Sequence, residues 1–66
     1  MLVLKLTMLE GRSHAQKREL TRRVAESAAQ HFDVPLGEVR VILYEVPPTH
    51  WSVGGKPLAE GKDAPL

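Results

Sequence analysis

The absence of cysteine from a chain of only 66 residues is the feature that most constrains its fold. A single core of this size rarely contributes more than about 3–5 kcal/mol, so small domains usually need an additional stabilising element. Disulfide bonds are excluded, and a structural zinc site of the usual cysteine-rich kind is excluded with them. Association between subunits is the remaining common solution. The sequence therefore predicts a protomer that completes its core inside an oligomer.

The charge balance and the hydropathy of the chain argue against two classes of partner. Nine lysines and arginines against eight acidic residues leave a formal net charge of +1, which is too balanced for a nucleic-acid-binding protein. No stretch reaches the roughly 18 apolar residues of a transmembrane helix, and the N-terminus lacks the basic region and long apolar stretch that are typical of a secretory signal. We expect a cytoplasmic protein with no membrane or nucleic-acid partner. We also expect Met1 to be retained, because aminopeptidases act before small second residues and Leu2 is large.

Hydrophobic periodicity predicts a strand, a helix and a second strand, in that order. Residues 2–9 alternate in the manner of a strand. Residues 39–46 are richer in β-branched residues and carry apolar side chains on both faces. Between them, Ser13 and Gln16 have the spacing of a capping box, which predicts a helix from His14 to about Phe32. The apolar stripe of this helix consists of Leu20, Val24, Ala28 and Phe32. This order predicts a right-handed β-α-β unit with parallel strands.

The C-terminal third of the chain is expected to form only short elements. Pro47 and Pro48 end the second strand, because proline cannot donate to a strand ladder, and residues 51–55 indicate a short hairpin. Residues 56–66 are expected to form a loose tail of a single domain that spans residues 1–66. The fold class is thus α/β (α+β), with one helix on a two-stranded sheet. Another protomer must cover the remaining sheet face.

Arg12 is the first candidate for a ligand-binding residue. It lies between the C-terminal end of the first predicted strand and the start of the helix. Ligands of α/β units gather at this end of the strands, and the helix dipole there favours anions. A guanidinium group can bind a carboxylate with two parallel hydrogen bonds. The alternative is a solvated loop arginine that pairs with Glu10.

Arg40 is the second candidate, because strand alternation places its charge on an apolar face. The residues that share this face are Ile42, Tyr44 and Val46. An arginine is rarely buried without a partner, since desolvating an unpaired charge is costly. The sequence leaves two roles open for Arg40. It either binds an anionic ligand or forms a structural ion pair, for example with Glu38 or Glu45 of a neighbouring chain.

Trp51 is the third candidate, and the remaining polar residues carry less information. As the only tryptophan, in a Pro/Gly-rich loop, it either packs at a subunit contact or forms an apolar wall that keeps a pocket dry. The three histidines lack metal-ligand spacing, and the chain has no phosphate-binding loop or nucleophile triad. We therefore expect no metal and no cofactor. The cation pairs at residues 17–18 and 22–23 indicate an ordinary solvated helix face.

Five short motifs, in their order and spacing, resemble the 4-oxalocrotonate tautomerase family. They are LEGRS at residues 9–13, QK at 16–17, PL at 35–36, VRVI at 39–42 and HWSVGG at 50–55. The resemblance runs from the first strand to Gly55. It implies a β-α-β protomer that pairs into dimers, with three dimers forming a hexamer. It also implies an isomerase that moves a proton between oxygen and carbon in unsaturated keto acids such as 2-hydroxymuconate.

The same resemblance assigns roles to the three candidate residues. Family members use an N-terminal proline as the base, kept neutral by a dry site and nearby cations. Two arginines bind the carboxylates of the substrate and stabilise the developing enolate charge, and they correspond to Arg12 and Arg40. The aromatic wall of the family corresponds to Trp51. The implied ligand is a small unsaturated dicarboxylate or keto acid.

The chain departs from the family at its first residues, where Leu2 stands in the position of the catalytic proline. The amine of Met1 lies one residue earlier, so it is displaced by about 3.3 Å and turned to the other face of the strand. Three hypotheses follow. The chain is a hetero-oligomer subunit whose proline-bearing partner supplies the base, or a homohexamer that uses the Met1 amine or no amine. The third is a scaffold that binds carboxylates without turnover.

Overall fold

A computed structural model describes residues 1–60 and contains the predicted β-α-β unit followed by a short hairpin. Its regular elements are β1 (Leu2–Leu9), α1 (His14–Phe32), the 3₁₀ turn η1 (Leu36–Glu38), β2 (Val39–Val46), the 3₁₀ turn η2 (Pro48–His50), β3 (Ser52–Val53) and β4 (Lys56–Pro57). Strands β1 and β2 are parallel, and β3 pairs with β4 in an antiparallel hairpin. The predicted fold class is confirmed.

The predicted capping box begins helix α1. The Ser13 hydroxyl oxygen accepts a hydrogen bond from the backbone N–H of Gln16 at 3.1 Å, and the Gln16 side chain accepts one from the Ser13 N–H at 3.0 Å. Without these bonds the backbone N–H groups of Ser13 and Gln16 would be unpaired donors at the helix N-terminus. At the other end Asp33 adopts a left-handed conformation with φ of 52°, and its N–H donates to Ala29. These caps fix where the crossover helix starts and ends.

The sheet has one face against α1 and one face that nothing within residues 1–60 covers. The strand register runs from Leu2 opposite Val39 to Leu9 opposite Val46, and exposure alternates along β1 and along β2 as far as Tyr44. The helix side carries Leu2, Leu4, Leu6, Met8, Val39, Val41, Leu43 and Glu45. The other side, here called the open face, carries Val3, Lys5, Thr7, Leu9, Arg40, Ile42, Tyr44 and Val46.

The protomer has no core of its own. No residue within positions 1–60 is fully buried, and the open-face side chains of Ile42 and Tyr44 are 40% and 47% exposed. The radius of gyration is 16.2 Å, whereas a compact chain of this length has about 11 Å. The molecule measures 52 × 25 × 16 Å, so it is an extended shape rather than a globule. A single copy therefore leaves its apolar surface in water, in keeping with the oligomer predicted from the sequence.

Helix α1 packs mainly against β2, which changes the part played by its apolar stripe. Val24 and Ala28 are half-buried as predicted, but Leu20 is 37% exposed and Phe32 is 65% exposed. The cause is the position of the helix over β2, which leaves open hollows on the β1 side. Leu20 lies in one of these hollows and Phe32 in another. The ends of the stripe are thus available to a second protomer.

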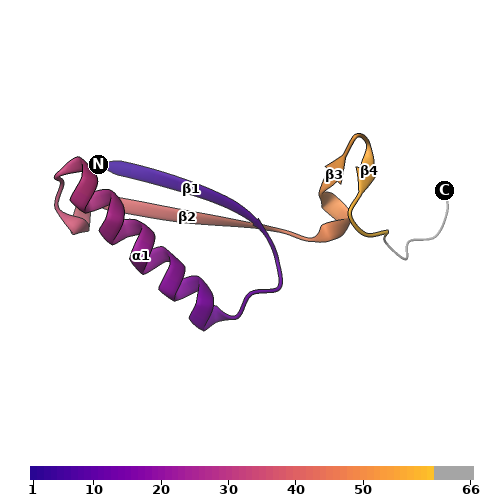
Figure 1. The fold of residues 1–66 in the computed structure, drawn as a ribbon, viewed down its shortest axis with the longest axis horizontal. Coiled ribbons are helices and arrows are strands. Elements are labelled where there is room, and N and C mark those ends of the chain that lie inside the picture. The colour runs from indigo at the N-terminus through magenta and orange to yellow at the C-terminus, as the bar shows by residue number, and fades with distance from the viewer. Residues whose placement is uncertain (61–66) are drawn as a thin grey trace.

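The hairpin stands clear of the sheet and helix at the far end of the molecule, as Figure 1 shows. Backbone N–H groups of Leu58 and Ala59 donate to the carbonyl oxygens of Trp51 at 2.8 Å and Pro48 at 3.3 Å. The segment expected to be a loose tail is therefore paired as far as Ala59, because β4 and these bonds tie it to η2. Residues 61–66 of that tail lie outside the described residues. No helix within the described part of the chain has the apolar length to cross a membrane.

Candidate active site

Arg12 lies in a hollow at the junction of β1 and α1. Gly11 turns the chain there with φ of +127°, a conformation that side chains rarely allow. The hollow is lined by Met8, Arg12, Gln16, Lys17 and Leu20. Within residues 1–60 Arg12 makes no salt bridge, so the alternative pairing with Glu10 is absent from this protomer. The lining of this hollow thus combines two cations, Arg12 and Lys17, with the apolar side chains of Met8 and Leu20.

Arg40 lies on the open face, at the start of β2. Its cross-strand neighbour is Val3, and its Nη1 donates a hydrogen bond to the carbonyl oxygen of Gly37 at 2.6 Å. No carboxylate within residues 1–60 pairs with it. Glu45 of the same chain lies on the opposite side of the sheet. The sequence placed Arg40 among apolar side chains, and the register agrees.

The structure does not bring Arg12, Arg40 and Trp51 together within one protomer. Arg40 is opposite Val3 and Arg12 follows Leu9, so the two arginines are at least about 20 Å apart along the sheet. They also lie on different sides of it. The hollow around Arg12 does not include Trp51, which is half-buried in its own loop. A small ligand therefore cannot contact both arginines of the same protomer.

The N-terminus shares one end of the sheet with Arg40. Leu2 pairs with Val39 and Val3 with Arg40, whereas Arg12 lies at the other end. Leu2 points to the helix side and is half-buried, while Met1 is 86% exposed. Leu2 is therefore the first residue of β1, and its partner Val39 precedes Arg40 on the neighbouring strand.

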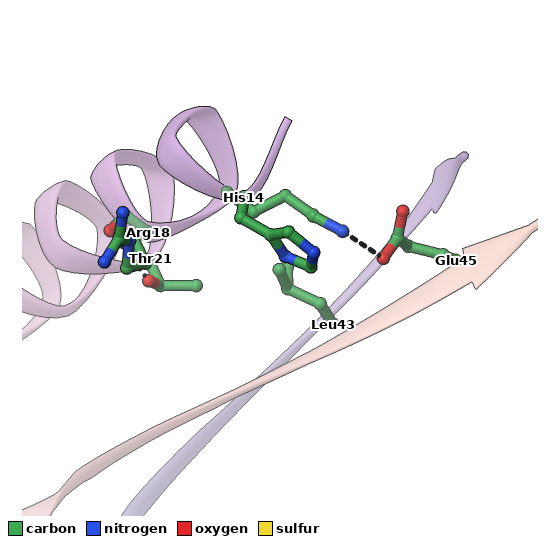
Figure 2. Close-up of a pocket in the computed structure, with 6 residues that line it drawn as sticks. His14, Arg18, Thr21, Leu43 and Glu45 are labelled. Atoms are coloured by element: carbon green, nitrogen blue, oxygen red, sulfur yellow. Dashed lines mark hydrogen bonds and ion pairs between the residues drawn. The ribbon is translucent and has the colours of Figure 1, made fainter. Parts of the chain in front are cut away.

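Lys17 and Glu45 form a salt bridge that the sequence did not predict. Lys17 Nζ is 2.7 Å from Glu45 Oε1, and the two side chains are only 17% and 31% exposed. Figure 2 marks the bond to Glu45 with a dashed line, and His14, Arg18, Thr21 and Leu43 line the same hollow. Lys17 therefore does not belong to an ordinary solvated helix face. The available signal was Glu45, the only acidic residue of either long strand, which alternation places toward the helix.

The other ion pairs of the helix lie away from both arginine candidates. Arg22 hydrogen-bonds Glu19 and Glu26, and Arg23 bonds Glu19 at 2.7 Å. The bonds from Arg22 and Arg23 lower the pKa of Glu19, and the bonds to Glu19 and Glu26 raise the pKa of Arg22. All four side chains are exposed, so this network is screened by solvent and contributes little to stability. Within residues 1–60 no cluster of three metal-ligating side chains occurs.

Breaking the Lys17–Glu45 pair is expected to destabilise the protein by about 1–2 kcal/mol, more than an exposed pair would. In Glu45→Gln the largely buried ammonium loses its counter-charge, whereas Lys17→Met combined with Glu45→Leu removes both charges and recovers most of the loss. Urea unfolding of the assembled protein measures the effect. Glu26→Gln is the control, since its partner Arg22 keeps Glu19. If Glu45→Gln and Glu26→Gln lowered the free energy of unfolding equally, the Lys17–Glu45 pair would contribute no more than an exposed pair.

Fold and site together define a small β-α-β protein with an uncovered sheet face and two widely separated arginines. The family model described as "Tautomerase enzyme" matches residues 3–61. The chain belongs to this tautomerase family. Its relatives imply an isomerase of the tautomerase type.

Similar proteins support this membership in sequence and in structure. The 2-hydroxymuconate tautomerase of Pseudomonas putida is 42% identical over 58 residues, which cover 88% of this chain and 92% of the relative. A heterohexamer 4-oxalocrotonate tautomerase from Chloroflexus aurantiacus J-10-fl has a chain that is 63% identical, with a TM-score of 0.84 over 91% of this chain and 97% of that one. A 4-oxalocrotonate tautomerase homologue is 48% identical, with a TM-score of 0.85 over 96% of this chain and 100% of the other.

Proposed function

We propose that this chain is a subunit of a 4-oxalocrotonate (2-hydroxymuconate) tautomerase in which a related, proline-bearing subunit supplies the base. This chain contributes Arg12 and Arg40 as carboxylate-binding residues and Trp51 as an apolar wall. The observation that carries the proposal is the separation of the two arginines by at least about 20 Å, on different sides of the sheet. Such a separation suits composite sites that draw residues from several protomers. A similar chain comes from a heterohexamer.

The proposed reaction moves one proton within 2-hydroxymuconate to give 2-oxo-3-hexenedioate. The neutral proline amine of the partner takes the proton from the 2-hydroxyl group and returns it to a carbon of the resulting dienolate. The arginines hold the carboxylates and stabilise the negative charge that develops on oxygen. Trp51 excludes water, which strengthens these charge interactions. We place the enzyme in the cytoplasm, in the catabolism of aromatic hydrocarbons.

The N-terminal residues are the reason for assigning the base to a partner. Leu2 occupies the position of the proline, and its backbone nitrogen is an amide if Met1 is retained. The Met1 amine lies about 3.3 Å further along the strand, on the other face. A misplacement of about 1 Å can cost roughly a hundredfold in rate. Proline-type catalysis by this chain alone is therefore expected to be slow.

The register of the sheet favours one second candidate function. Because Val3 pairs with Arg40, the Met1 amine lies at the same sheet end as one of the two arginines. A homohexamer that uses this amine would show activity without a partner, and N-terminal acetylation would abolish it. Binding of the dicarboxylate with no turnover, alone or with any partner, would instead indicate a non-catalytic scaffold.

The deciding experiment compares this chain alone, a proline-bearing tautomerase-family chain from the same organism alone, and the two co-expressed. We expect a stoichiometric complex whose turnover of 2-hydroxymuconate exceeds that of this chain alone by at least about 100-fold. Native mass spectrometry gives the stoichiometry, and ultraviolet absorbance follows the reaction. An inactive complex, or a partner that is equally active without this chain, would refute the proposal.

A further inference from the structure

The open face of the sheet carries positive charge and no negative charge. Its charged side chains are Lys5 and Arg40, and the remaining six are apolar except for Thr7. The only acidic residue of either strand is Glu45, which lies on the helix side and pairs with Lys17. Lys5 has no carboxylate partner within residues 1–60. The face is therefore apolar with two unbalanced cations.

Lys5 occupies the middle of this face. It lies between Val3 and Thr7 on β1, and its cross-strand neighbour on β2 is Ile42. Val3 is 43% exposed, so these surroundings are open in the single protomer and would close on assembly. An ammonium group that is buried without a counter-charge is strongly unfavourable. Whatever covers the face must then supply an anion near Lys5.

A second copy of this chain that docks through its own open face does not supply that anion. Two open faces of the same sequence would bring together four cations and no carboxylate from either strand pair. Like charges across an interface repel, and this repulsion is a common means of rejecting the wrong partner. A bound substrate carboxylate could neutralise Arg40, but Lys5 would remain unpaired. The charge pattern thus opposes self-association of two open faces and favours a chain that presents negative charge.

We propose that the open face docks on a different tautomerase-family chain that presents a carboxylate opposite Lys5, so that Lys5 selects the hetero-oligomer over the homo-oligomer. This inference rests on the proposed function in one respect, since it takes the partner to be the proline-bearing subunit. It adds the chemistry by which the two chains recognise each other. The apolar residues supply the contact area, and the charge pair supplies the choice of partner.

The first test uses the purified chain alone and measures self-association by sedimentation equilibrium. Lys5→Gln removes one of the two positive charges of the open face. Lys5→Glu places a negative charge beside the remaining Arg40, so that the face has no net charge. We expect self-association to become tighter. The dissociation constant of the homo-oligomer should fall about tenfold from wild type to Lys5→Gln and further in Lys5→Glu. The control Arg18→Glu makes the same charge change as Lys5→Glu at an exposed residue of α1 that is not on the open face, and it should leave the value unchanged. An unchanged or higher dissociation constant in both Lys5 variants would overturn the inference.

The second test measures binding to the proline-bearing chain, for which we expect the opposite order of affinities among wild type and the two Lys5 variants. Wild type is expected to bind at least about tenfold more tightly than Lys5→Gln, and Lys5→Glu more weakly still. Equal binding by all three would also overturn the inference. Both tests read association and not turnover. An active complex with statistical assembly would reject only the role of Lys5, whereas charge-ordered assembly without activity would reject only the proposed function.

Discussion

Replacing Arg40 with alanine is expected to lower kcat/KM for 2-hydroxymuconate by about 100- to 1,000-fold in the assembled enzyme, and Arg12→Ala should have an effect of similar size. Each guanidinium is proposed to stabilise charge that is larger in the transition state than in the substrate. Lysine at either position keeps the charge but loses the bidentate hydrogen bond to a carboxylate. The kcat/KM values of Arg12→Lys and Arg40→Lys should therefore lie between those of wild type and the alanine variants. Steady-state kinetics followed by absorbance provides the measurement.

A matched control and a mixing experiment test where these arginines act. Arg18→Ala removes an exposed helix cation and should leave kcat/KM within about twofold of wild type. If each site takes Arg12 and Arg40 from different copies, mixing Arg12→Ala and Arg40→Ala chains before assembly should restore about a quarter of the activity, because each contribution is drawn independently. No recovery in the mixture would show that both arginines act from one chain, against their separation in the protomer. Normal activity in both single variants would remove them from the site.

Much of the fold could be predicted because local signals and side-chain periods agree. The alternation of residues 2–9 and 39–46 predicts both strands, and Ser13 with Gln16 predicts where the helix begins. Proline at positions 47 and 48 marks the end of β2. The pairing of Lys56 and Pro57 with β3 was not predicted, because a two-residue strand has no period to detect. The bonds that extend this order to Ala59 depend on η2, which is itself a tertiary feature.

The candidate site was predictable residue by residue but not as an arrangement. Strand alternation correctly places Arg40 beside Ile42 and Tyr44, since period two needs no tertiary information. The rotation and lateral position of α1 on the sheet do need it. For that reason the sequence predicted neither the exposure of Phe32 nor the contact between Lys17 and Glu45, which are 28 residues apart. How far Arg12 lies from Arg40 follows only once the strands are set parallel and in register.

Placing a lysine at Ile42 on the open face is expected to abolish both assembly and stable folding. No residue within positions 1–60 is fully buried in one protomer, so folding free energy must come mainly from contacts between copies or partners. Ile42 is the cross-strand neighbour of Lys5, and a third cation there would be buried without a counter-charge. We expect Ile42→Lys to lose its cooperative thermal transition and most of its helical circular dichroism at micromolar concentration.

The wild-type protein and a matched variant make this outcome specific. Because assembly and folding are coupled, the Tm of wild type should rise with protein concentration, by several degrees for each tenfold increase. Ala15→Lys adds the same charge at an exposed helix position and should unfold within about 2 °C of wild type. The open face would then be the surface that converts an extended protomer into a folded one. An Ile42→Lys chain that remained a helical monomer with a cooperative transition would show instead that the β-α-β unit is stable without a partner.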